Sequence, residues 1–223
     1  YQGAEVSFED LEEFATRSDI HWLNHWVENG HRREDNIIPG FNLIVLDVDG
    51  TYSITAAMEI LEGYRGFIYT TKSHTDDTHR YRIILPTNYT LYLNREDYKE
   101  FMANVFQSLP FKADEQGDHR SKKWLSNDGE STFFGNEDAQ LFDVTPFIPK
   151  TKKNDDRKEH MEKYGSQDAL ENWFINNIGN GNRNHQLHKF ARVLIDQGHD
   201  FPYIQNAVYE LNDKIADKLS RDE

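Results

Sequence analysis

Apolar residues recur at helical spacing near the start of the chain. Phe14 and Ala15 lie three and four positions after Leu11, and an apolar face continues to Val27. Acidic residues follow Ser7, as expected in the first turn of a helix that this serine would cap. The spacing therefore predicts one helix from about Ser7 to Val27.

The hydrophobic period changes after this stretch. The pattern predicts, in chain order, a strand over 41–46, a helix over 54–61, a strand over 66–71, a strand over 81–85 that Pro86 stops, and a helix over 94–109. Short strand candidates follow at 132–134 and 141–142. This order of elements is typical of an α+β sheet of the ferredoxin-like or RNA-recognition (RRM) type.

The last part of the chain shows only helical patterns. Three helices are predicted over 166–178, 184–197 and 201–215, and prolines and a charge run separate them from the sheet region. We therefore expect a catalytic domain over 1–148, a linker over 149–165, and a small all-α helical bundle over 166–223.

Composition narrows the possible functions. The 223 residues include no cysteine, which excludes disulfides, thiolate zinc sites, iron–sulfur clusters and cysteine nucleophiles. No apolar run is long enough to cross a bilayer, so we expect no membrane partner and a cytoplasmic location, in the host if the protein is viral. The chain begins at Tyr1 without a leader, which suggests a piece of a longer protein. The net charge of −14 argues against binding nucleic acid over the whole surface but permits a local basic groove.

Two aspartates end the first strand of the sheet region. Asp47 and Asp49 are two positions apart, so they share a face of the strand, and like charges this close usually hold a divalent metal. The alternative is a turn that begins at Asp49-Gly50.

One resemblance is to phosphohydrolases of the haloacid dehalogenase type. The string from Leu46 to Thr51 resembles their first motif, and Tyr69-Thr70-Thr71 is similar to their second. The resemblance implies that Asp47 is a nucleophile and that magnesium is required. That family also needs an acidic pair at the end of a later strand, and the pairs at 76–77 and 155–156 both follow polar or charged residues.

A second resemblance covers residues 41–125. An Asp-x-Asp strand is followed by Thr70-Thr71-Lys72-Ser73-His74, by an arginine-containing strand over 80–86, and by Asp114 after a helix. This order resembles the archaeo-eukaryotic primase superfamily in its phage and plasmid primase-polymerase form. The resemblance implies a template-directed DNA primase and polymerase, a nucleotidyltransferase that takes nucleoside triphosphates and a single-stranded DNA template and works alongside a helicase domain or protein.

The same resemblance assigns roles to individual residues. Asp47, Asp49 and Asp114 would be catalytic and would hold Mg²⁺ or Mn²⁺. Lys72, Ser73, His74, Arg80 and Arg82 would bind the nucleotide, and two arginines that share a strand face suit a triphosphate. His79 remains an alternative to His74, and Asp118 an alternative to Asp114.

A basic patch follows the third acid. In it, Arg120, Lys123 and Trp124 are candidate template contacts, since aromatic and basic side chains bind single strands together; alternatively Trp124 packs at the sheet edge. The C-terminal helices resemble the helical domain that follows the catalytic domain in these enzymes, which implies template or nucleotide contacts by Arg183, His185 and Lys189. A third hypothesis is a non-catalytic nucleic-acid-binding module of a replication complex.

Overall fold

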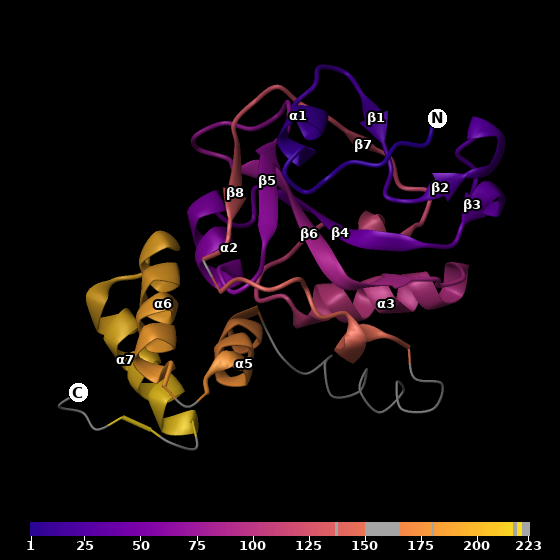
Figure 1. The fold of residues 1–223 in the computed structure, drawn as a ribbon. Coiled ribbons are helices and arrows are strands. Elements are labelled where there is room, and N and C mark those ends of the chain that lie inside the picture. The colour runs from indigo at the N-terminus through magenta and orange to yellow at the C-terminus, as the bar shows by residue number, and fades with distance from the viewer. Residues whose placement is uncertain (137, 150–165, 180, 216–217, 220–223) are drawn as a thin grey trace.

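The computed structural model of the chain describes residues 1–136, 138–149, 166–179, 181–215 and 218–219, and Figure 1 traces them from end to end. The helices are α1 (Leu11–Ala15), α2 (Ile54–Leu61), α3 (Arg95–Ser108), α5 (Ser166–Asn177), α6 (Arg183–Asp196) and α7 (Phe201–Lys214). The strands are β1 (His21–Trp22), β2 (Trp26–Val27), β3 (Ile37–Ile38), β4 (Phe41–Asp49), β5 (Gly66–Thr70), β6 (Arg80–Leu91), β7 (Trp124–Leu125) and β8 (Ser131–Phe134). Short 3₁₀ turns are η1 (Glu28–Gly30), η2 (Glu34–Asn36), η3 (Glu115–Asp118) and η4 (Thr145–Phe147).

The main sheet has four strands in the order β4-β6-β5-β8, and every neighbouring pair is antiparallel. The third strand of the sheet along the chain, β6, lies between the first two, which is the split βαβ arrangement. The fourth strand, β8, pairs with β5 and not with β4. The predicted α+β class and the predicted order of strand, helix, two strands and helix are confirmed.

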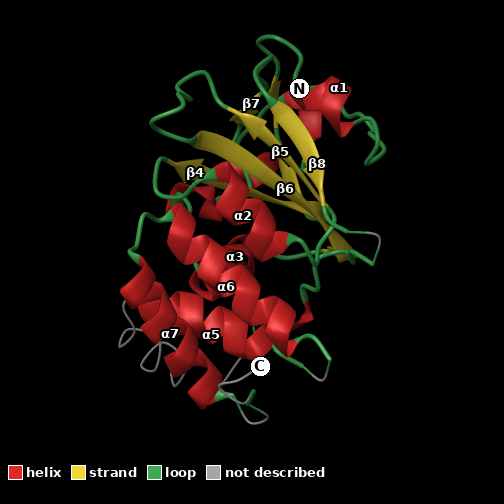
Figure 2. Cartoon of the chain, turned by 90° about the vertical axis from the view of Figure 1, so that its left-hand side faces the viewer, coloured by secondary structure: helices red, strands yellow, loops and turns green. Residues whose placement is uncertain are grey.

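The two faces of this sheet are covered differently. Side chains alternate along each strand, so Leu46 and Ile83 join one hydrophobic cluster with α2 and α3, while Val45 and Ile84 join another. The second cluster contains Trp124 of β7 together with residues of α1 and β1. Figure 2 shows the helices stacked beneath the sheet and α1 above it.

The C-terminal helices pack against α2. Residues of α5, α6 and α7 join the same hydrophobic cluster as α2, and Arg192 of α6 pairs with Glu59 at 3.0 Å. Glu62 pairs with His185 at 3.1 Å and with Lys189, which is buried, at 3.2 Å. His185 and Lys189 therefore hold α6 to the end of α2, and this structure does not present them to a template. Residues 150–165, which make up nearly all of the predicted linker, lie outside the described residues.

The predicted N-terminal helix over Ser7–Val27 is wrong. Only Leu11–Ala15 is helical, and the following residues form β1 and β2. Trp22 pairs with Trp124 of β7, far later in the chain, and this pairing buries both rings. His21 lies on β1, and His25 is buried in the loop after it.

The predicted end of the third strand at Pro86 is also wrong, because β6 continues to Leu91. Strand β5 pairs with β6 only as far as Ile84, so no β5 residue needs a hydrogen bond from position 86. On its other side Pro86 lies opposite Leu43, next to a register shift in β4. A proline is tolerated at such an edge or irregularity because its missing N–H breaks no ladder. None of the described helices has the length and apolar character needed to span a bilayer.

Candidate functional site

Four charged side chains meet where β4 ends and β6 begins. Asp47 lies opposite Arg82, and Asp49 lies opposite Arg80, in the antiparallel register of the two strands. Arg82 Nε is 3.3 Å from Asp47 Oδ1, and Arg80 Nη1 is 3.5 Å from Asp49 Oδ1. The alternation of side chains places all four on the upper face of the sheet, where directly opposed opposite charges stabilise the pair of strands.

Asp47 and Arg82 are the two least exposed members of this group, with side chains 12% and 14% exposed. Burial raises the pKa of Asp47 above its usual value, the charge of Arg82 lowers it, and the charges of Asp49 and Asp114 raise it further. Its Oδ1 has no hydrogen-bond partner among the described residues. This oxygen is nevertheless the one that lies 3.3 Å from Arg82 Nε, so the ion pair with Arg82 compensates its charge without an aligned hydrogen bond.

The third predicted acid reaches the same place. The backbone N–H of Asp114 donates to the carbonyl oxygen of Asp47 at 2.7 Å, and the Asp114 carboxylate lies 3.5 Å from Lys122 Nζ. Its alternative, Asp118, pairs instead with Lys99 at 3.6 Å and His119 at 3.3 Å. The structure thus places Asp114, and not Asp118, beside Asp47.

The predicted phosphate loop connects β5 to β6, and only part of it faces the acids. The backbone N–H of Arg80 donates to His74 Nδ1 at 3.1 Å, so a proton remains on Nε2 to donate elsewhere. The His79 ring centre lies 5.5 Å from that of His74. Ser73 is exposed, and Lys72 binds Asp19 at 2.6 Å. His74 and Arg80 are brought together, whereas the Lys72 ammonium is held away by Asp19.

Two of the predicted template residues are buried by their contacts. Trp124 is 3% exposed, with Arg82 5.5 Å and Lys122 5.3 Å from its ring centre. A ring covered in this way supports the neighbouring cations and offers no free face to a base, so the packed alternative describes Trp124. Arg120 is 8% exposed and binds Glu34 at 2.7 Å and the Leu93 carbonyl at 3.2 Å. Lys123 is exposed, as a template contact requires.

Two further residues of the site were not singled out from the sequence. Lys122 is one charge of the basic patch, and its contact with Asp114 depends on the path of the loop before β7, which the sequence pattern does not predict. The Tyr69 hydroxyl accepts a hydrogen bond from Arg82 at 3.4 Å. Tyr69 lies two positions after Phe67 in the predicted strand, and this spacing was the available signal, since it places both rings on one face.

The carboxylates have the chemistry of a site for Mg²⁺ or Mn²⁺, which prefer carboxylate oxygens. Within the described ranges, however, no three histidine or acidic side chains are already close enough together to hold a metal ion. Each of the three aspartates is paired with a cation of its own, Arg82, Arg80 or Lys122. Binding a metal would therefore require these pairs to open.

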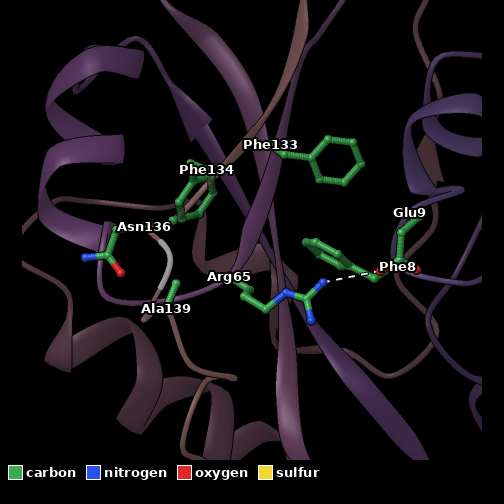
Figure 3. A pocket seen from close by; sticks show the side chains of 8 residues that line it. Phe8, Glu9, Arg65, Phe133, Phe134, Asn136 and Ala139 are labelled. Carbon is green, nitrogen blue, oxygen red and sulfur yellow. Dashed lines mark hydrogen bonds and ion pairs between the residues drawn. The ribbon is translucent and has the colours of Figure 1, made fainter.

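A separate pocket of about 520 Å³ lies at the far edge of the sheet, beside β8. Figure 3 shows Arg65 reaching toward Glu9, and the two side chains are 3.3 Å apart. The Arg65 guanidinium also lies 4.7 Å from the ring centre of Phe8, which meets Phe133 edge to face. Arg65, the cation that lines this pocket, is thus already paired with Glu9 and packed on Phe8. The pocket is separate from the cluster of Asp47, Asp49 and Asp114, which we call the acidic site, because none of these residues lines it.

Fold and site together describe an α+β protein with a cluster of aspartates and arginines at one end of its central sheet. The family model described as the VapE N-terminal domain matches residues 21–161, more than half of the chain, and the chain belongs to this family. The domain is found in replication-associated proteins of phages and plasmids. No curated protein and no solved structure matches the chain.

Proposed function

We propose that this chain is a template-directed nucleotidyltransferase, a DNA primase and polymerase of phage or plasmid replication. One observation carries the proposal: Asp47 and Asp49 share a face of β4 with Arg80 and Arg82 of β6, and the Asp114 backbone is hydrogen-bonded to Asp47. Carboxylates for metal next to cations for phosphate are the two requirements of nucleotidyl transfer. The family's association with replication proteins agrees with this reaction.

Asp47, Asp49 and Asp114 would hold the divalent ions. Once their ion pairs open, the Asp47 carboxylate and the partly exposed Asp49 and Asp114 carboxylates supply oxygen ligands of the right kind. Bound Mg²⁺ or Mn²⁺ would lower the pKa of the attacking 3′-hydroxyl and stabilise the departing pyrophosphate.

The chain's own cations would orient the triphosphate. Arg80 is 40% exposed, so its guanidinium can turn from Asp49 to a phosphate without unpacking the core. Guanidinium groups bind phosphate through two parallel N–H bonds, which fixes the phosphate's orientation as well as its charge. The Nε2–H of His74, whose Nδ1 accepts the Arg80 backbone N–H, would donate to the same group.

Primer synthesis on single-stranded DNA with labelled nucleotides and Mg²⁺ or Mn²⁺ tests the proposal. We expect the double variant Asp47→Asn, Asp49→Asn to lose at least about 100-fold in rate, as loss of a charge-stabilising group typically costs. The matched control is Asp138→Asn, Asp213→Asn, which removes the same charge from two exposed carboxylates elsewhere. Thermal melting of both variants checks that they are folded.

The outcomes separate the three hypotheses. Undiminished synthesis by the Asp47, Asp49 variant would overturn the assignment. An aspartyl-phosphate analogue trapped on Asp47, with no nucleotide transfer by the wild type, would indicate the phosphohydrolase. Salt-dependent DNA binding that is unaffected by metal removal, again without synthesis, would indicate a non-catalytic module.

A further inference from the structure

Two loops that are distant in sequence are joined beside the acidic site. One is residues 31–36, in the connection from β2 to β3, and the other is residues 119–123, just before β7. Arg32 Nη1 donates to the Ser121 carbonyl at 2.5 Å, and Arg120 Nε donates to Glu34 at 2.7 Å. We call these two segments together the basic ridge. The two contacts, one from each loop, fix its halves against each other.

The ridge is positively charged on a protein whose net charge is −14. Its segments contain five arginine and lysine residues and only two acidic ones, Glu34 and Asp35. Burial raises the pKa of Glu34, but the hydrogen bond from Arg120 and the charge of that arginine lower it further, so the pKa lies below its usual value. Glu34 is therefore charged, and its charge neutralises that of Arg120. Arg33 and Lys123 are exposed, and neither pairs with an acidic side chain in the part of the chain that the structure describes. Their charge is therefore available to a ligand.

One loop of the ridge contacts the acidic site, and the other belongs to a hairpin with an exposed apolar pair. At one end, Lys122 lies 3.5 Å from Asp114. At the other end, Trp26 of β2 and Ile38 of β3 form a cross-strand pair whose side chains are 48% and 41% exposed. The opposite face of this hairpin, Val27 with Ile37, is turned inward. Cations on a loop together with an exposed tryptophan on the hairpin that carries this loop are a combination that suits single strands, because phosphates pair with the cations and bases stack on the ring.

We propose that the basic ridge binds the phosphate backbone of single-stranded DNA and leads it between the acidic site and Trp26. The inference deepens the proposed function and rests on it for the direction of the strand, but the binding itself needs no catalysis. Charge complementarity favours this occupant, since a nucleic acid backbone supplies the repeated negative charge that Arg33 and Lys123 lack.

Fluorescence anisotropy with a labelled oligothymidylate of about 20 nucleotides tests the ridge. The full chain is titrated in EDTA, so that metal at the acidic site contributes nothing. The test variant is Arg33→Gln, Lys123→Gln, and the control Lys218→Glu changes the net charge by the same amount at an exposed residue near the C-terminus. Because the changed side chains are exposed, all variants should fold, and thermal melting verifies this.

We expect the double glutamine variant to bind at least about fivefold more weakly at low salt. Its slope of log affinity against log salt should be shallower by about 1.4, which is two phosphate contacts at about 0.7 each for single strands. Trp26→Ala should weaken binding by about fivefold or more, and Phe201→Ala, which removes an exposed ring from α7, should not. Affinities and slopes equal to those of Lys218→Glu would overturn the proposal. The same titration with labelled oligouridylate tests RNA as the ligand: a double glutamine variant that loses oligouridylate binding but keeps oligothymidylate binding would also overturn it.

The ridge and the proposed reaction can fail separately. If the wild type makes no primers but the double glutamine variant still loses DNA binding, the ridge stands and the nucleotidyltransferase does not. If primers are made and the double glutamine variant binds and extends them normally, the ridge is wrong and the reaction stands. The variant Asp47→Asn, Asp49→Asn should keep the wild-type dependence of DNA binding on salt, since neither residue belongs to the ridge.

Discussion

The ion pair between Arg82 and Asp47 is buried enough to carry a quantitative stability prediction. Their side chains are 14% and 12% exposed, and the nearest atoms are 3.3 Å apart. At an effective dielectric constant of 20, two unit charges at this distance attract by about 5 kcal/mol before desolvation is subtracted. Removing one partner of a buried pair leaves the other charge uncompensated, which typically costs about 3–5 kcal/mol. We therefore expect Arg82→Gln to lower the free energy of unfolding by about 3 kcal/mol at neutral pH.

A double-mutant cycle isolates the pair from the other contacts of Arg82, which also donates to the Leu125 carbonyl at 2.6 Å. The variants are Arg82→Gln, Asp47→Asn and their combination, each unfolded in urea without metal. We expect a coupling of at least about 2 kcal/mol, because the double variant leaves no buried charge. The control is Arg80→Gln: its pair with Asp49 is 40% and 52% exposed, so we expect a loss below about 1 kcal/mol.

Divalent metal provides the last arm of this experiment. In Arg82→Gln the Asp47 carboxylate keeps its charge without its partner, and Mn²⁺ can supply the missing positive charge. We expect millimolar Mn²⁺ to restore more stability to Arg82→Gln than it adds to the wild type. A coupling below about 0.5 kcal/mol would refute the reasoning, since that size is typical of a solvent-screened pair. An equal response of all variants to Mn²⁺ would show that Asp47 does not contact the ion.

Three further predictions concern stability. Burial, and then the charge of Arg120, lower the pKa of His25 from 6.5 to about 4, so protonation favours the unfolded chain. The free energy of unfolding should therefore fall by about 3 kcal/mol as the pH drops from above 6.5 to below about 4. In urea titrations, His25→Phe should remove that fall. Glu62→Ala should cost about 3 kcal/mol by calorimetry, because it leaves Lys189 buried without a partner. Gly66→Ala would place its Cβ 1.9 Å from a phenyl ring of β8 and should cost about 1–3 kcal/mol in thermal melts, whereas Gly63→Ala, with open space around it, should be nearly neutral.

The central elements were predictable because their signals are local. The helix predicted over 54–61 has the bounds of α2, and its Ser53 hydroxyl accepts the Ala56 N–H as an N-cap should. Asn94 caps α3 in the same way, through the N–H of Asp97. Strand alternation then places Asp47 and Asp49 on one face without knowledge of any other strand.

Features that depend on distant partners were not predictable. The period of the N-terminal stretch suits a helix, yet Trp22 gains more by burial against Trp124 than by continuing a helix, and periodicity carries no information about that partner. The same holds for Trp124, whose basic neighbours suggested an exposed stacking surface until the fold placed Arg82 and Lys122 over its ring. The sharing of a face by Arg80 and Arg82 was predictable, but the register that sets them against the aspartates was not.

The pairing of charges in the site constrains how it could work. Three aspartates and three cations face one another, Asp47 and Asp49 with arginines and Asp114 with Lys122. Under the proposed function, metal alone would leave the three cations facing added positive charge, and a triphosphate alone would be repelled by the three carboxylates. Metal and triphosphate bound together keep every charge paired: the carboxylates with the ions and the cations with the phosphates. The ion pairs of the unliganded site therefore favour joint binding of metal and nucleotide over binding of either one alone. The coupling free energy is the cost, avoided in joint binding, of leaving buried charges such as Asp47 and Arg82 unpaired.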